Sequence, residues 1–108
     1  MVYSIGEIQE LVQPVVKKYQ IPALYLFGSY ARGEATEESD LDFLVDTEGT
    51  DLTSLLKLGA LYCDLEKLFD KRLDLITERS IMQIGPMPTD VELRDNVMKE
   101  RVRLNAVS

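Results

Sequence analysis

The sequence predicts an α/β (α+β) fold in which helices pack on a small mixed β-sheet. Three short apolar runs have the length and composition of buried strands, and segments of helical periodicity separate them. The chain has 108 residues, of which 45% are hydrophobic and 29% are charged, so it is long enough to form one ordinary core. We therefore expect a single domain over residues 1–108.

The first predicted element is a helix over residues 4–19. Ser4 and Glu7 have the spacing of a capping box, and apolar residues follow them at helical spacing. Pro14 lies inside this pattern, so we expect the helix to kink or to split there. An apolar run over residues 23–27 follows the helix and predicts a buried strand.

The remaining predicted elements alternate in the same way. In chain order they are a strand over residues 41–46, a helix from Asp51 or Thr53 to about Phe69, a strand over 72–77, a helix from Thr89 or Asp90 to about Glu100, and a short edge strand over 102–104. Cys63 lies among apolar residues of the 51–69 helix, so we expect it in the core. The apolar stripe of that helix is wider than a core face requires. Deep burial and a surface for a partner or for self-association both remain open.

The composition excludes several classes of chemistry. The chain has no histidine and one cysteine, which rules out histidine-based catalysis, histidine-ligated zinc and an intrachain disulfide. A net charge of −7 argues against a nucleic-acid surface, and the sequence has neither a membrane-spanning apolar run nor a secretory signal. We expect a cytoplasmic protein whose metal, if it has one, is a hard ion held by oxygen ligands.

Three aspartates stand where strands are predicted. Asp40 and Asp42 project to the same side of a strand, because successive side chains alternate between its faces. Asp74 interrupts the apolar run over residues 72–77, where a carboxylate is costly unless it is paired or coordinates something. If these strands are neighbours, three carboxylates converge and can hold two metal ions. Asp74 is then also a natural acceptor for the proton of an attacking hydroxyl.

A second group of residues suits a phosphate. Gly28 follows the first strand and lets the backbone approach a phosphate closely, and a short helix starting at Ser29 would direct free N–H groups toward it. Arg32 lies one turn later and can contact a triphosphate, and Gly33 ends the turn. Alternatively, Arg32 forms a surface ion pair with Glu34 or Glu37.

The motif made of Gly28-Ser29, ten intervening residues and Asp40-x-Asp42 resembles the signature of the DNA polymerase β-like nucleotidyltransferase superfamily. The sequence of residues 27–33 and the short length of the chain are most similar to those of the minimal nucleotidyltransferase (MNT) group. Further matches strengthen the resemblance: Arg32-Gly33, Ser39 and Asp74.

This resemblance extends over residues 4–104 and implies the nucleotidyltransferase (polymerase β palm-like) fold. It also implies transfer of AMP from ATP with the help of Mg²⁺, with two ions expected. Carried over to this chain, it assigns Mg²⁺ binding and catalysis to Asp40, Asp42 and Asp74, and nucleotide binding to Gly28, Ser29, Arg32 and Ser39.

The resemblance also suggests a biological role. MNT proteins are commonly encoded beside a HEPN-domain protein and act as the antitoxin of a toxin–antitoxin pair, some by adding AMP to a tyrosine of the HEPN ribonuclease. We expect the same partner here, in a homo- or hetero-oligomer, with no direct binding of nucleic acid or membrane. Two alternatives remain: an antitoxin that masks its partner only by binding, and a small-molecule nucleotidyltransferase, although those chains usually carry a further acceptor domain.

Overall fold

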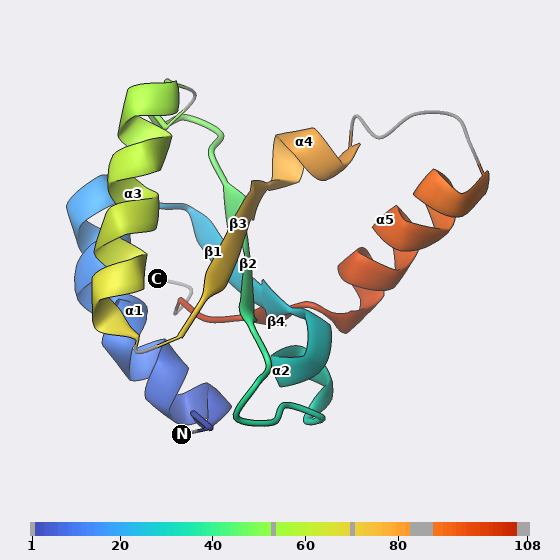
Figure 1. Cartoon of the computed structure of the whole chain (residues 1–108). Coiled ribbons are helices and arrows are strands. Elements are labelled where there is room, and N and C mark those ends of the chain that lie inside the picture. The colour runs from blue at the N-terminus through green and yellow to red at the C-terminus, as the bar shows by residue number, and fades with distance from the viewer. Residues whose placement is uncertain (1, 53, 70, 83–87, 106–108) are drawn as a thin grey trace.

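The computed structural model describes residues 2–52, 54–69, 71–82 and 88–105. Its elements, in chain order, are α1 (Ile5–Tyr19), β1 (Ala23–Phe27), α2 (Gly28–Arg32), β2 (Leu41–Asp46), α3 (Leu55–Leu68), β3 (Leu73–Thr77), α4 (Glu78–Met82), α5 (Pro88–Glu100) and β4 (Val102–Arg103) (Figure 1). The predicted α/β fold with a small mixed sheet is confirmed. No helix among these residues is long and apolar enough to cross a membrane.

The strands form one sheet in the order β3-β2-β1-β4. β1 runs antiparallel to both β2 and β4, whereas β2 and β3 are parallel and are connected through α3. A parallel pair needs such a crossover, which explains why a long helix separates the two strands that carry aspartates. The predicted edge strand near the C-terminus is confirmed as β4.

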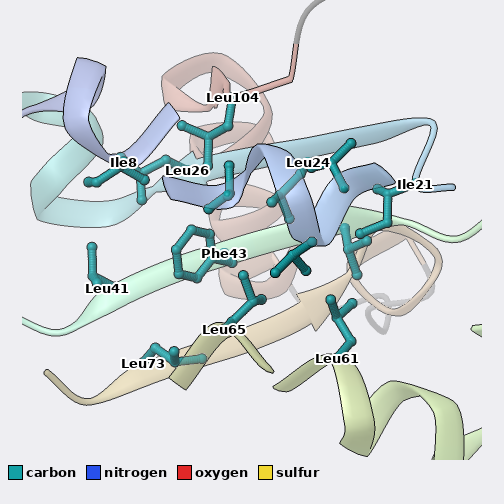
Figure 2. Packing of buried hydrophobic residues seen from close by; sticks show 14 of the residues in the cluster. Ile8, Ile21, Leu24, Leu26, Leu41, Phe43, Leu61, Leu65, Leu73 and Leu104 are labelled. Atoms are coloured by element: carbon teal, nitrogen blue, oxygen red, sulfur yellow. The ribbon is translucent and has the colours of Figure 1, made fainter. Parts of the chain in front are cut away.

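Helices cover the two faces of this sheet unequally. α1 and α3 pack on one face, and α4 and α5 lie on the other (Figure 1). The main core lies under α1 and α3, where side chains from both helices meet alternate residues of the strands (Figure 2). Leu41, Phe43 and Val45 of β2 are fully buried there, as their alternation with Asp42 and Leu44 predicts.

α1 begins at the predicted capping box. The Ser4 hydroxyl accepts a hydrogen bond from the Glu7 amide at 3.1 Å, and the Glu7 carboxylate accepts one from the Ser4 amide at 3.0 Å. The helix continues through Pro14 without a break, so the alternative that it splits there is wrong. Pro14 is exposed, and its ring costs the helix one backbone hydrogen bond without disturbing the buried face.

α3 begins later than the sequence predicts. Its first residue is Leu55, with Ser54 at the N-cap position, whereas the predicted start was Asp51 or Thr53, the second of which lies outside the described residues. The Thr50 hydroxyl donates to the Thr47 carbonyl at 2.7 Å and accepts from the Leu52 amide at 3.1 Å. These local bonds hold the segment in a turn and compete with helix formation.

The outer face of α3 is also more exposed than expected. Leu61 and Leu65 are fully buried, which turns the opposite face of the helix to solvent. Cys63 lies on that outer face and is exposed, so the prediction that it belongs to the core is wrong. Leu55 and Leu56 are 87% and 83% exposed, which excludes deep burial of the whole apolar stripe.

Two leucines of α3 offer a matched test of this packing. Leu61→Ala removes a fully buried side chain and should lower the free energy of unfolding by about 2–5 kcal/mol. Leu55→Ala truncates an exposed side chain of the same helix and should change it by less than about 0.5 kcal/mol. Urea unfolding of both variants measures the difference, and similar losses in the two would contradict this placement of α3.

Candidate active site

The register of β2 and β3 brings two aspartates together. Asp42 of β2 pairs with Asp74 of β3 on one side and with Phe27 of β1 on the other. Strand alternation sends both carboxylates to the face of the sheet that carries α4 and α5, opposite the main core. Asp40 comes directly before β2, two residues before Asp42, so alternation places both on the same side of the strand. The strand that carries Asp74 therefore lies beside the strand of Asp42, as predicted.

Asp42 has the strongest electrostatic perturbation of these acids. Its carboxyl is half-buried, and burial is the main cause that raises its pKa from 3.8 to about 6. The negative charges of Asp74 and Asp40 raise this pKa further, and a hydrogen bond with Asp74 acts in the same direction, whereas Arg32 lowers it. A carboxylate in this position favours either a proton or a neighbouring cation.

Gly28 packs its backbone directly against Asp42. A Cβ atom at Gly28 would lie 3.2 Å from the Asp42 Cγ and still closer to one carboxylate oxygen, Oδ2. Gly28 also has a φ of +74°, which L-residues with side chains rarely adopt. Both observations require glycine here, because the Asp42 carboxylate occupies the place that a side chain would take at the start of α2.

Ser29 and Gly33 mark the two ends of the short helix α2. Ser29 is half-buried, and its hydroxyl makes no hydrogen bond to any other residue that the structure describes. Gly33 has a φ of +74° and ends the helix in the left-handed conformation, as predicted. The free hydroxyl and the first amides of α2 can therefore donate hydrogen bonds to a phosphate.

Arg32 is held by two carboxylates. Its Nε donates to Glu34 at 3.1 Å, and its Nη1 donates to Glu100 of α5, also at 3.1 Å. The pair with Glu34 is the local alternative that the sequence left open, whereas no sequence signal indicates Glu100, which lies 68 residues away. The Arg32 side chain is 41% exposed. Exposed ion pairs are weak, so a phosphate can replace either carboxylate.

Ser39 is engaged in the loop that leads to Asp40. Its hydroxyl accepts a hydrogen bond from the Thr36 amide at 2.8 Å, and its amide donates to the Thr36 carbonyl at 3.0 Å. In this arrangement Ser39 shapes the turn before the acids. For the predicted contact with the nucleotide, the Ser39 hydroxyl would have to give up its hydrogen bond with the Thr36 amide.

The donor set suits a hard cation, although the carboxylates do not yet enclose one. No group of three or more His, Cys, Asp or Glu side chains in the described part of the chain is gathered closely enough to hold a metal ion as it stands. Asp74 is exposed and Asp40 half-exposed, so rotation of these side chains can close the set around Asp42. All-oxygen ligands are those that Mg²⁺ prefers.

A cavity lies away from the acids, at the opposite end of β2. It has a volume of about 390 Å³ and is lined by residues at the C-terminal ends of β2 and β3, among them Asp46, Thr47 and Arg79. None of the predicted site residues lines it. The acids and α2 thus form an open surface site at the other end of β2.

Comparison with known proteins finds relatives that match most of the chain. The family described as the nucleotidyltransferase domain matches residues 8–104. A provisionally named protein adenylyltransferase of Methanocaldococcus jannaschii is 40% identical over 82 residues, which cover 72% of this chain and 82% of that protein. The protein adenylyltransferase MntA of Thermococcus cleftensis is 43% identical over 65 residues, which cover 60% of this chain and 64% of that one.

Solved structures show the same fold. A provisionally assigned minimal nucleotidyltransferase is 33% identical, with a TM-score of 0.64 over 93% of this chain and 95% of its own. A toxin–antitoxin crystal structure with AMP-PNP is 20% identical, with a TM-score of 0.67 over 93% of this chain and 74% of its own, and shares the fold. The chain therefore belongs to the nucleotidyltransferase domain family and is a nucleotidyltransferase, which confirms the resemblance indicated by its motif.

Proposed function

We propose that this nucleotidyltransferase transfers AMP from ATP to a hydroxyl of a partner toxin and thereby acts as its antitoxin. The partner is a HEPN-domain protein, and the acceptor is a tyrosine. The observation that carries the proposal is the pairing of Asp42 with Asp74 beside Gly28, because it joins an acid pair to a phosphate-binding backbone. The relatives named as protein adenylyltransferases support AMP as the transferred group and a protein as the acceptor.

The residues around α2 bind the triphosphate in this proposal. The amides at the start of α2 and the Ser29 hydroxyl donate to phosphate oxygens. Arg32 exchanges Glu34 or Glu100 for a phosphate, with which its guanidinium forms stronger, charge-assisted hydrogen bonds. Ser39 supplies a further hydroxyl after leaving Thr36.

The acids carry out the transfer. Asp40, Asp42 and Asp74 would hold Mg²⁺, which neutralises charge on the phosphates and the carboxylates when it is bound. The acceptor hydroxyl oxygen forms a bond to the α-phosphorus, the bond from that phosphorus to the bridging oxygen breaks, and pyrophosphate leaves. Asp74 accepts the hydroxyl proton. Its exposure on β3, an edge strand of the described sheet, leaves it accessible to a tyrosine of another protein.

The exposed leucines of α3 favour a macromolecular partner over a small-molecule acceptor. Leu55 and Leu56 are adjacent, and both are more than four-fifths exposed. Contiguous exposed apolar residues are more typical of surfaces that another protein covers than scattered ones are. The same observation supports the second candidate function, an antitoxin that neutralises its partner by binding alone.

The first prediction of this proposal concerns Gly28. Gly28→Ala places a methyl group against the Asp42 carboxylate on a left-handed backbone, so the carboxylate or the start of α2 must shift, and Mg²⁺–ATP binding should weaken by about tenfold or more. Asp42→Asn should have a comparable effect. Isothermal titration calorimetry with ATP, in Mg²⁺ and in EDTA, measures both variants against the wild type.

Gly59→Ala is the matched control for Gly28→Ala. A Cβ at Gly59, on the exposed side of α3, would meet no atom within 4 Å, so this variant should bind Mg²⁺–ATP like the wild type. Equal wild-type affinity for ATP in Mg²⁺ and in EDTA would contradict the metal assignment. Unchanged binding in Gly28→Ala would exclude the start of α2 as the phosphate site.

A second prediction concerns pH. Because the pKa of Asp42 is about 6 in the folded protein and 3.8 as a free group, the native state holds this proton more tightly than the unfolded chain. This stabilisation is complete below the lower pKa and is lost as the pH rises through about 6. In EDTA, the free energy of unfolding of the wild type should therefore fall relative to that of Asp42→Asn between these two pH values. Parallel pH profiles for the two proteins would show that Asp42 is not perturbed.

A third prediction separates catalysis from binding. After incubation of the chain with its partner toxin, Mg²⁺ and ATP, intact mass spectrometry should show a partner that is heavier by one or more AMP units. Asp42→Asn and Asp74→Asn should abolish this gain, because the first removes a metal ligand and the second also removes the proton acceptor. Protection of cells by Asp42→Asn as effective as that by the wild type, with no AMP added in either case, would instead establish the binding-only antitoxin.

A further inference from the structure

We propose that Lys71 is a positioning residue for nucleotidyl transfer, whose ammonium fixes Asp40 relative to Asp74 through the loop before β2. The inference rests on the proposed use of these acids in Mg²⁺ and ATP binding. Lys71 lies in the short segment between α3 and β3, three residues before Asp74. No sequence motif includes Lys71.

The Lys71 ammonium is bound by three carbonyl oxygens of one loop. Its Nζ donates to the carbonyl of Glu37 at 2.7 Å, to that of Ser39 at 3.2 Å and to that of Thr36 at 3.4 Å. An ammonium has three donors, so this turn can satisfy all of them. Hydrogen bonds from a charged donor are stronger than neutral ones, and these join residues that are 32 to 35 positions apart in the chain.

These contacts bracket Asp40. The Ser39 carbonyl that binds Lys71 belongs to the same peptide group as the Asp40 amide, so its orientation restrains the backbone of Asp40. On the other side, the Leu41 amide donates to the Arg72 carbonyl at 3.0 Å. Two consecutive residues, Lys71 and Arg72, therefore hold both neighbours of Asp40, and the same segment continues into β3 and Asp74.

Lys71 also contacts the helix proposed to bind phosphate. Its ammonium lies 5.6 Å from the centroid of the Tyr30 ring, within the range of a cation–π interaction. Tyr30 is 3% exposed and follows Ser29 in α2. One side chain thus connects α2, the loop before Asp40 and the start of the strand that carries Asp74. This position explains how an open surface site can keep its acids in a defined arrangement.

The test is a double-mutant cycle on the affinity for Mg²⁺–ATP, measured by isothermal titration calorimetry. Lys71→Met keeps most of the side-chain length but removes the charge and the three donors, and it should weaken binding by about tenfold. Lys71→Arg retains charge and donors and should recover part of this loss. In an Asp40→Asn background, Lys71→Met should weaken binding by less than about twofold, because the residue that it positions has already lost its charge.

Hydrogen exchange gives a readout that does not depend on nucleotide. In Lys71→Met, the amides of Ser39 and Leu41 should exchange faster, while the amide of Val12 in α1 should exchange at the wild-type rate. The control is Lys17→Met, which removes an exposed lysine of α1 and should alter neither the exchange nor the affinity.

The outcomes distinguish this inference from the proposed function. Full additivity of Lys71→Met and Asp40→Asn, or unchanged affinity in Lys71→Met, overturns the role of Lys71 while Mg²⁺–ATP binding by the wild type stands. A wild type that binds ATP equally in Mg²⁺ and in EDTA overturns the acid site, and the role of Lys71 with it. A wild type that binds Mg²⁺–ATP normally but adds no AMP to the toxin overturns the proposed function alone.

Discussion

Two carboxylates on neighbouring parallel strands are held side by side by the packing of the sheet itself. Asp42 and Asp74 pair in register, and their strand neighbours Leu41, Phe43 and Leu73 are buried on the opposite face. A slip of one residue would turn Phe43 out of the core and Asp42 into it, which the hydrophobic core forbids. Burial of apolar side chains on the other side of the sheet therefore holds the two acids together in spite of their repulsion. The core and the site are two consequences of one register.

That constraint explains the properties of the surrounding residues. Burial and the neighbouring negative charges of Asp74 and Asp40 raise the pKa of Asp42 to about 6. A carboxylate in this environment is ionised more readily when a cation lies beside it. Gly28 adds no side chain beside Asp42, and the charge of Arg32 lowers this pKa. In this protein of net charge −7, a cation is therefore favoured most at the start of β2, around Asp42. In the proposed function, a metal-bound triphosphate would supply this positive charge through its metal, and α2 would supply donors for the phosphates.

The sequence predicted those parts of the molecule that depend on local periodicity. Alternation along a strand placed Asp42 opposite Phe43, and the capping-box spacing located the start of α1. Contacts between residues that lie far apart in the chain could not be predicted in this way. Glu100 reaches Arg32 across 68 residues, and Lys71 reaches a turn more than 30 residues before it. Each contact is specified only after the sheet has formed.

The errors on α3 have a related origin. Cys63 was assigned to the core because apolar residues surround it in sequence, but Leu61 and Leu65 are the fully buried residues of α3, with Leu58, Tyr62 and Leu68 packed partly against the core. A helix on a sheet of this size buries one narrow stripe, and a wider apolar pattern must leave part of itself exposed. The sequence thus shows that α3 has more apolar residues than its core contact needs. Which of these residues remain exposed is decided by how the helix packs on the sheet.

The exposed stripe and the acids lie on different faces of the sheet, which bears on how binding and catalysis are related. α3 packs on the face opposite Asp42 and Asp74, and Leu55 borders a groove that also includes Leu75 of β3. β3 is an edge strand of the described sheet, and Asp74 is exposed along it. A partner that covers Leu55 can therefore reach Asp74 only around this edge. Leu55 and Leu56 lie at the start of α3, away from the acids. In the proposed function, substitutions of these two leucines would therefore disturb partner binding while leaving the acids intact, and substitutions of the acids would do the reverse.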